Sequence, residues 1–197
     1  MRSLFAFLLA AAVQLTALSA VQASTVHRIG GFLPDLRFTL ASVDSPTVTE
    51  DDFDNKIVML FFGYASCPDI CPTTMAQLSH VMQNLGDDAA KVRIIFISVD
   101  PHRDTPNILQ SYVDAFSSNA VGLTGTEKQI AAVAKRYRVS YQIARPSDAD
   151  GKHYDVTHSR GIYFFDHKGK ARFLASDGES VDALTETARQ LLAESAS

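Results

Sequence analysis

The chain contains two cysteines, Cys67 and Cys71, with three residues between them. A spacing of four along a helix or a tight turn brings both sulfur atoms to the same side of the backbone. At that distance they are close enough to form a disulfide or to bind one metal ion. The spacing alone leaves both chemistries open.

The flanking residues predict that the cysteines lie in a strand-to-helix turn. Residues 57–62 form a continuous apolar run, which is typical of a strand buried on both faces. After the cysteines, Met75, Leu78, Met82 and Leu85 recur at helical spacing. A helix start presents unpaired N–H groups and the positive end of the helix dipole, and both favour a thiolate over a thiol.

Length and composition predict one globular domain with a sizeable core, because 46% of the 197 residues are hydrophobic and no internal repeat is present. The formal net charge is −4, and the acidic residues are spread along the chain. No basic patch with interleaved aromatic residues occurs in the sequence, so we do not expect nucleic acid as a partner.

The first 23 residues predict export. Arg2 precedes an apolar run over residues 4–12, and the segment ends in Val21-Gln22-Ala23, the pattern of a secretory signal peptide cleaved after Ala23. The alternative is an uncleaved membrane anchor, since the apolar segment is nearly long enough to span a bilayer. Either possibility places the domain outside the cytoplasm. Residues 24–34 are expected to be a flexible leader, and residues 35–197 the folded domain.

A structural disulfide is the simplest use of two cysteines in an exported protein. A bridge that closes so short a loop removes little entropy from the unfolded chain, and a domain of this size does not need one. Reactive or metal-binding use of Cys67 and Cys71 is therefore favoured.

A second apolar run, residues 92–99, predicts a strand parallel to the first, joined to it by the cysteine helix. The loop 98–106 then lies at the same sheet edge as Cys67. Thr105 and Pro106 predict the start of a helix. Its expected inner face consists of Ile108, Leu109, Tyr112, Val113 and Phe116.

The rest of the chain completes an α/β pattern. Thr126 and Gln129 form a capping-box pair that opens another helix, residues 140–157 are expected to form a long loop, and residues 161–174 a hairpin before a last helix near Ser180. Alternating apolar residues over 36–48 predict an extra N-terminal hairpin. This order indicates a thioredoxin-like three-layer sandwich, a central mixed sheet flanked by helices.

Three segments resemble the signatures of one family. They are residues 67–72 (Cys-Pro-Asp-Ile-Cys-Pro), 98–106 (Ser-Val-Asp-Pro-His-Arg-Asp-Thr-Pro) and 155–159 (Asp-Val-Thr-His-Ser). In this order they resemble the Sco/SenC family, copper-binding thioredoxin-fold proteins of the mitochondrial inner membrane and the bacterial envelope. The resemblance implies that Cys67, Cys71 and His158 bind one copper ion, as Cu(I) or Cu(II).

The resemblance also implies a function. Family members deliver copper to the binuclear Cu(A) site of cytochrome c oxidase, or reduce the cysteines of that site before it is loaded. The implied partner is the apo Cu(A) subunit or another periplasmic copper or thiol protein. The implied location is the periplasm or the outer face of the inner membrane, with membrane association only if the N-terminal segment is retained. His102 stands where relatives often have an acidic residue, and His153 is a second histidine near the third segment.

Two other functions compete with copper delivery. The first is thiol–disulfide exchange, in which Cys67 attacks a substrate disulfide and Cys71 resolves the mixed disulfide. The second is a peroxiredoxin-like peroxidase, which is disfavoured because such enzymes usually carry Thr-x-x-Cys, and Tyr64 and Pro68 stand three residues before the two cysteines. For Asp100, Arg103 and Asp104, a role in orienting the site or steering a partner and a merely structural loop ion pair both remain open.

Overall fold

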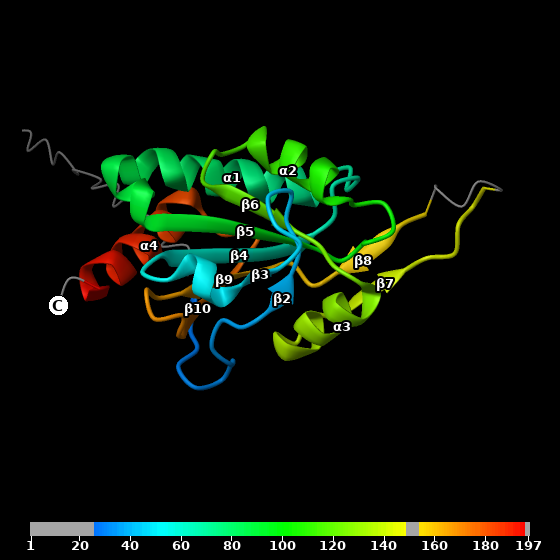
Figure 1. Cartoon of the computed structure of the whole chain (residues 1–197). Helices are drawn as coiled ribbons and strands as arrows, with labels where there is room; N and C mark the ends of the chain where they lie inside the picture. Colours follow the sequence, from blue (N-terminus) through cyan, green and yellow to red (C-terminus); the bar gives the residue numbers. More distant parts are fainter. Residues whose placement is uncertain (1–25, 149–153, 196–197) are drawn as a thin grey trace, which may run out of the picture.

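A six-stranded mixed sheet forms the centre of the computed structural model, which describes residues 26–148 and 154–195 (Figure 1). Across the sheet the strands are β1 (His27–Arg28), β10 (Ala171–Ser176), β9 (Gly161–Phe165), β4 (Ile57–Gly63), β5 (Val92–Ser98) and β6 (Ala120–Leu123). Two antiparallel pairs lie outside it, β2 (Thr39–Leu40) with β3 (Val48–Thr49), and β7 (Tyr141–Ile143) with β8 (Val156–His158). The helices are α1 (Ile70–Leu85), α2 (Pro106–Asp114), α3 (Glu127–Arg136) and α4 (Val181–Ser195), with 3-10 turns η1 (Glu50–Phe53) and η2 (Gly86–Lys91).

Strands β4 and β5 form the middle of the sheet. Every residue of β4 is buried, as expected of an apolar run without alternation. The two strands pair in parallel from Ile57 opposite Val92 to Gly63 opposite Ser98. At that edge the Gly63 carbonyl accepts the N–H of Val99 at 2.8 Å. The cysteine turn and the loop after β5 therefore start side by side, as the sequence predicts.

Helices cover both faces of the sheet (Figure 1). On the face of α1 and α2, the ring of Phe96 contacts Phe61 and Tyr112, with centroids 6.1 Å and 5.3 Å away. Phe62 points to the other face, because successive strand residues alternate. There it contacts Tyr137, the residue that follows α3. The predicted three-layer sandwich is confirmed.

The helices begin where the sequence predicts. The Thr105 hydroxyl accepts the N–H of Ile108 at 3.3 Å, and Thr126 with Gln129 forms the expected capping box. One inner-face prediction is wrong: Ile108 is 48% exposed. Neighbouring helix residues differ by about 100° around the axis, so a short helix that buries Leu109 turns Ile108 outward.

Four short strands, β1, β6, β7 and β8, are absent from the sequence prediction. Strand β1 lies in the expected leader, where His27 pairs with Leu174 and the side chains of Ile29 and Leu33 are buried. The folded domain therefore begins before residue 35. Strands β7 and β8 interrupt the segment 140–157, for which the sequence predicts a loop. The predicted N-terminal hairpin is present as β2 and β3.

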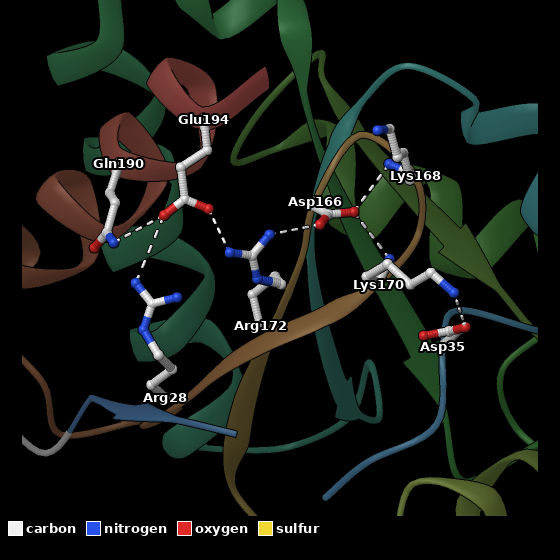
Figure 2. Close-up of polar contacts among 8 residues, drawn as sticks. All are labelled: Arg28, Asp35, Asp166, Lys168, Lys170, Arg172, Gln190 and Glu194. Atoms are coloured by element: carbon white, nitrogen blue, oxygen red, sulfur yellow. Dashed lines mark hydrogen bonds and ion pairs between the residues drawn. The ribbon is translucent and has the colours of Figure 1, made fainter. Parts of the chain in front are cut away.

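Charged side chains join the N-terminal strand to the last helix (Figure 2). Arg172 on β10 donates to Asp166 at 2.8 Å and to Glu194 on α4. Arg28 on β1 lies 3.6 Å from the same Glu194 carboxylate. These pairs bind β1, the β9–β10 hairpin and α4 to one another at the edge of the sheet.

No helix in the described part of the chain has both the length and the apolar character needed to cross a membrane. The signal peptide or anchor predicted for residues 1–23 lies outside the described residues, and so does His153.

Candidate metal centre

The turn between β4 and α1 holds the two cysteines in different environments. The N–H of Cys67 donates to the Tyr64 carbonyl at 3.2 Å within the turn, whereas Cys71 lies in the first turn of α1. The Cys71 side chain is completely buried, and that of Cys67 is partly exposed. Both are free thiols. The pair presents one sulfur near the surface and keeps the other in the core.

Gly63 allows α1 to start close to the end of β4. A Cβ atom at this position would lie 2.8 Å from the Cys71 sulfur and 2.8 Å from two ring atoms of Phe96. Real Cβ contacts are almost never so short, so any side chain here would displace one of these neighbours. The absence of a side chain at Gly63 thus makes room for the Cys71 sulfur.

The Cys67 sulfur is stabilised as a thiolate. Its sulfur accepts the N–H of Cys71 at 3.5 Å. Burial by itself would raise the pKa of Cys67, but hydrogen bonds from the N–H groups of Asp69 and Cys71, with further ones from the Cys71 and Tyr64 side chains, lower that pKa below its ordinary value. This agrees with the prediction that the helix start favours a thiolate.

The Cys71 sulfur is held as a thiol. Burial raises its pKa well above the ordinary value, and the neighbouring Cys67 and Asp104 raise it further. A buried thiol of this kind ionises only when a positive charge approaches or when its partner sulfur is consumed.

His158 lies beside Cys71, although 87 residues separate them in the sequence. Its Nε2 atom is 3.5 Å from the Cys71 sulfur. The imidazole makes edge-to-face contacts with the rings of Phe61 and Tyr64, whose centroids are each 6.0 Å from the imidazole centroid. The structure therefore brings together two of the three residues that the family resemblance implies as ligands, Cys71 and His158, and Cys67 contacts the same helix start.

The hydrogen bonds of His158 define its tautomer. Nδ1 lies 2.9 Å from the Ser159 carbonyl oxygen, which can only accept a hydrogen bond. Burial lowers the pKa of His158, so the ring is neutral at pH 7. The single ring proton therefore sits on Nδ1, and the lone pair of Nε2 faces the Cys71 sulfur. This is the form in which an imidazole binds a metal.

Asp104 ties the cysteine turn to the end of β5. Its Oδ2 atom accepts the N–H of Ala65 at 2.9 Å and the hydroxyl of Ser98 at 2.6 Å. Asp104 is 1% exposed, and this burial raises its pKa. Asp100 and Arg103 instead contact Tyr154, on the segment that leads to His158. All three loop residues therefore hold the segments that carry the site.

A surface cavity of about 350 Å³ opens beside the cysteine turn. Its lining includes Cys67, Tyr64, Ile70, Val156 and His158. Solvent or a partner can reach the Cys67 sulfur and the imidazole through this opening, whereas the Cys71 sulfur lies behind them.

His102 does not belong to this site. Its side chain is exposed and its Nε2 atom lies 3.0 Å from a Glu127 carboxylate oxygen at the start of α3.

Sequence reasoning missed two residues that shape the site, Gly63 and Tyr154. A glycine that ends a buried strand just before a cysteine is a usable signal, because it marks a close approach of other atoms. Tyr154 gives no such signal, since its role depends on contacts with residues more than 50 positions away.

The three candidate ligands do not form a finished coordination sphere. Within residues 26–148 and 154–195, no group of three or more His, Cys, Asp or Glu side chains is arranged so that it could hold a metal ion.

Comparison with known proteins identifies relatives along most of the chain. Protein SenC of Rhodobacter capsulatus is 40% identical over 131 residues, which cover 66% of this chain and 58% of that protein. The mitochondrial protein SCO2 of Saccharomyces cerevisiae is 36% identical over 146 residues, which cover 74% of this chain and 48% of that protein. The chain thus spans about half the length of these curated relatives.

A solved structure of ScoI from Bradyrhizobium japonicum, with copper bound, superimposes with a TM-score of 0.70 at 34% identity, covering 80% of this chain and 96% of that one. The family model SCO1/SenC matches residues 31–193, a span that includes the cysteine turn, the loop after β5 and the His158 strand. The resemblance of the three short segments is confirmed over residues 31–193, and the chain belongs to the SCO1/SenC family.

Proposed function

We propose that this protein is a copper metallochaperone that binds one copper ion through Cys67, Cys71 and His158 and transfers it to a partner. The observation that carries the proposal is the convergence of distant segments on one point, with His158 Nε2 3.5 Å from the Cys71 sulfur and the Cys71 N–H on the Cys67 sulfur.

The donor set fits copper. Thiolates are soft ligands that select Cu(I), and a neutral imidazole also suits Cu(II), so two sulfurs and one nitrogen can hold either oxidation state. A structural zinc site would need four protein ligands, and the sequence has no third cysteine. The lone pair of His158 Nε2 already faces the Cys71 sulfur. The proposal requires Cys67 and His158 to move closer around the ion when it binds.

The asymmetry of the two cysteines supports transfer. The ion would arrive at Cys67, whose sulfur is ionised most easily and borders the surface cavity. The positive charge of the ion would then favour ionisation of the buried Cys71 thiol. On departure, a partner would displace Cys67 and His158 first, because both border the cavity and Cys71 is buried.

The similarity to a ScoI structure with copper bound supports copper as the cargo. We further propose that the recipient is the apo Cu(A) subunit of cytochrome c oxidase, or another copper or thiol protein outside the cytoplasm. The N-terminal pattern of residues 1–23 supports export to the periplasm or to the outer face of the inner membrane.

Copper titration of a His158→Ala variant tests the ligand set. The reduced protein is titrated without oxygen with Cu(I) and Cu(II), and optical and EPR spectra are recorded. We expect a one-to-one Cu(II) complex with intense sulfur-to-copper charge transfer. In His158→Ala this band should be lost. The Cu(II) affinity should fall by more than roughly 10–100-fold, which is the usual cost of removing only a hydrogen-bond partner of a metal ligand.

His80→Ala is the matched control. His80 is exposed on α1, the helix that also carries Cys71, and it contacts Gln83 rather than the cysteines. Its copper complex should equal that of the unaltered protein. Unchanged Cu(II) affinity in His158→Ala would show that the ligand assignment is wrong.

Thiol–disulfide exchange is the second candidate, and the difference between the two thiols favours it. The Cys67 thiolate would attack a substrate disulfide and release one substrate thiol, and Cys71 would then displace the second substrate thiol and leave a Cys67–Cys71 disulfide. If added Cu(II) oxidises the pair to a disulfide and is not retained, this second function becomes the better one.

A further inference from the structure

His158 lies at the end of an arm formed by strands β7 and β8. Among the described residues these two strands pair only with each other, with Tyr141 opposite His158. After His158 the chain enters β9 through Arg160, whose carbonyl accepts the N–H of Asp177 at 3.1 Å. The position of the segment that leads to His158 therefore depends on side-chain contacts between the arm and the domain.

One set of contacts comes from the loop after β5. The Asp100 side chain is completely buried, and its Oδ1 atom accepts the hydroxyl of Tyr154 at 2.7 Å. Its other oxygen accepts the Nε–H of Arg103. A buried carboxylate is stable only if its oxygens are paired, and here each oxygen has a partner. Burial, with the hydrogen bond to Asp100, raises the pKa of Tyr154 to about 12, so the hydroxyl stays a donor.

Arg103 connects Asp100 and Tyr154 to the aromatic residue that packs against the His158 imidazole. Its guanidinium lies 3.7 Å from the centre of the Tyr154 ring, and its Nη1 donates to the Tyr154 carbonyl at 3.0 Å. The same guanidinium is 5.6 Å from the ring of Tyr64, which packs against His158. Stacking and a fixed fork of donors make arginine suited to hold two aromatic segments together.

We propose that Asp100, Arg103 and Tyr154 form a latch that positions His158 against the cysteines, and that the latch determines how well the site holds Cu(II) compared with Cu(I). Tyr154 is four residues before His158, so releasing its hydroxyl and ring frees the arm next to the ligand. Two thiolates suffice for Cu(I), whereas Cu(II) gains from the nitrogen. Opening the latch therefore weakens the Cu(II) complex selectively. The affinity part of this inference rests on the proposed function.

Tyr154→Phe tests the latch with the smallest change, because it removes the hydroxyl and keeps the ring under Arg103. We expect the affinity for Cu(II) to fall about 10–100-fold, the usual cost of losing an outer partner of a metal ligand, while the affinity for Cu(I) stays within about threefold. EPR of the Cu(II) form should show a second population with weaker nitrogen coupling. Tyr154→Ala removes the stacked ring as well and should lower the Cu(II) affinity further.

Tyr163→Phe is the matched control. Its hydroxyl donates to the Tyr137 carbonyl at 3.2 Å on the other face of the sheet, so the variant also loses one tyrosine hydrogen bond. Both copper affinities should stay unchanged. If Tyr154→Phe and Tyr154→Ala bind Cu(II) as the unaltered protein does, or lose Cu(I) and Cu(II) affinity equally, the latch does not position the ligand.

A readout without copper separates this inference from the proposed function. In the reduced protein, nuclear Overhauser contacts between the His158 ring and the rings of Phe61 and Tyr64 should weaken in Tyr154→Phe and persist in Tyr163→Phe. Failure of the unaltered protein to bind copper would reject the proposed function and leave this test valid. Undiminished ring contacts in Tyr154→Phe would reject the latch whatever the copper result.

Discussion

At the scale of single residues, the two cysteines show how a spacing of four can give opposite chemical behaviour. Cys67 lies just before the first turn of α1 and receives N–H groups, whereas Cys71 lies inside that turn and is surrounded by the core. Hydrogen bonds lower the pKa of Cys67 despite its partial burial, and burial raises the pKa of Cys71. Metal entry and thiol exchange both begin with an ionised sulfur, so either function would start at Cys67.

Alkylation of the reduced protein tests this difference. Only the thiolate reacts, so the rate at Cys67 should rise with pH through a midpoint below the ordinary thiol pKa of about 8.5. The Cys71 thiol remains protonated over this range, and we expect it to react at least about tenfold more slowly at pH 7. Iodoacetamide labelling followed by tandem mass spectrometry measures both rates in the same molecule. Equal rates at the two positions would contradict the assigned environments.

At the scale of elements, the site depends on how closely a strand and a helix meet and on a separate arm. Strand β4 ends at Gly63, directly against the Cys71 sulfur and the Phe96 ring. The arm of β7 and β8 supplies His158, whose Nε2 atom lies 3.5 Å from the Cys71 sulfur. The central sheet thus fixes the position of the cysteine turn, whereas the position of His158 depends on side-chain packing and on the contacts of Tyr154.

Gly63→Ala tests the junction of β4 and α1. The added Cβ meets Cys71 and Phe96 at 2.8 Å, so the core must shift, and overpacking of this kind costs about 1–3 kcal/mol of the free energy of unfolding. Urea denaturation measures the loss, and the displaced Cys71 sulfur should also weaken copper binding. Gly30→Ala is the control, because nothing lies within 4 Å of its added Cβ. A Gly63→Ala protein as stable as Gly30→Ala would mean that the junction is not tightly packed.

At the scale of the whole molecule, ion pairs hold the chain together at the edge of the sheet (Figure 2). Burial would raise the pKa of Asp166, but the Arg172 guanidinium and the N–H groups of Lys170 and Lys168 hold it below its usual range. Hydrogen bonding from Gln190 and the charge of Arg172 likewise lower the pKa of Glu194. A carboxylate with a lowered pKa in the folded state stabilises the fold above its ordinary pKa, and this contribution disappears as the pH falls through the folded value.

Arg172→Met should therefore lower stability at neutral pH and flatten its dependence on acid. We expect a loss of about 1–2 kcal/mol at pH 7, most of it from the buried Asp166, because solvent screens the exposed pair with Glu194. The loss should shrink as the pH falls below about 3.9, the ordinary pKa of aspartate, and should vanish only when the pH falls through the lower pKa of Asp166 in the folded protein. Urea denaturation from pH 2.5 to 7 measures it. Lys168→Met is the control, since Lys168 contributes its backbone N–H to Asp166, and an equal loss there would contradict a specific role for Arg172.

The amino-acid sequence predicts the central strands, the helix starts and the position of the cysteine turn. These features depend on signals within a few residues: continuous apolar runs, Thr105 with Pro106, and a helical stripe after Cys71. It also determined the family, through three short segments in one order. The sequence does not predict strand β1 or the arm strands β7 and β8. A strand of two or three residues is too short to show a periodic apolar pattern.

The geometry of the site follows from the folded structure and not from local sequence patterns. That His158 meets Cys71, that Gly63 makes room for the sulfur and that Tyr154 reaches Asp100 are contacts between residues brought close by folding, up to 87 positions apart in the chain. Such contacts depend on how side chains from separate elements pack in three dimensions. Local periodicity carries no information about that packing, and only the folded arrangement reveals it.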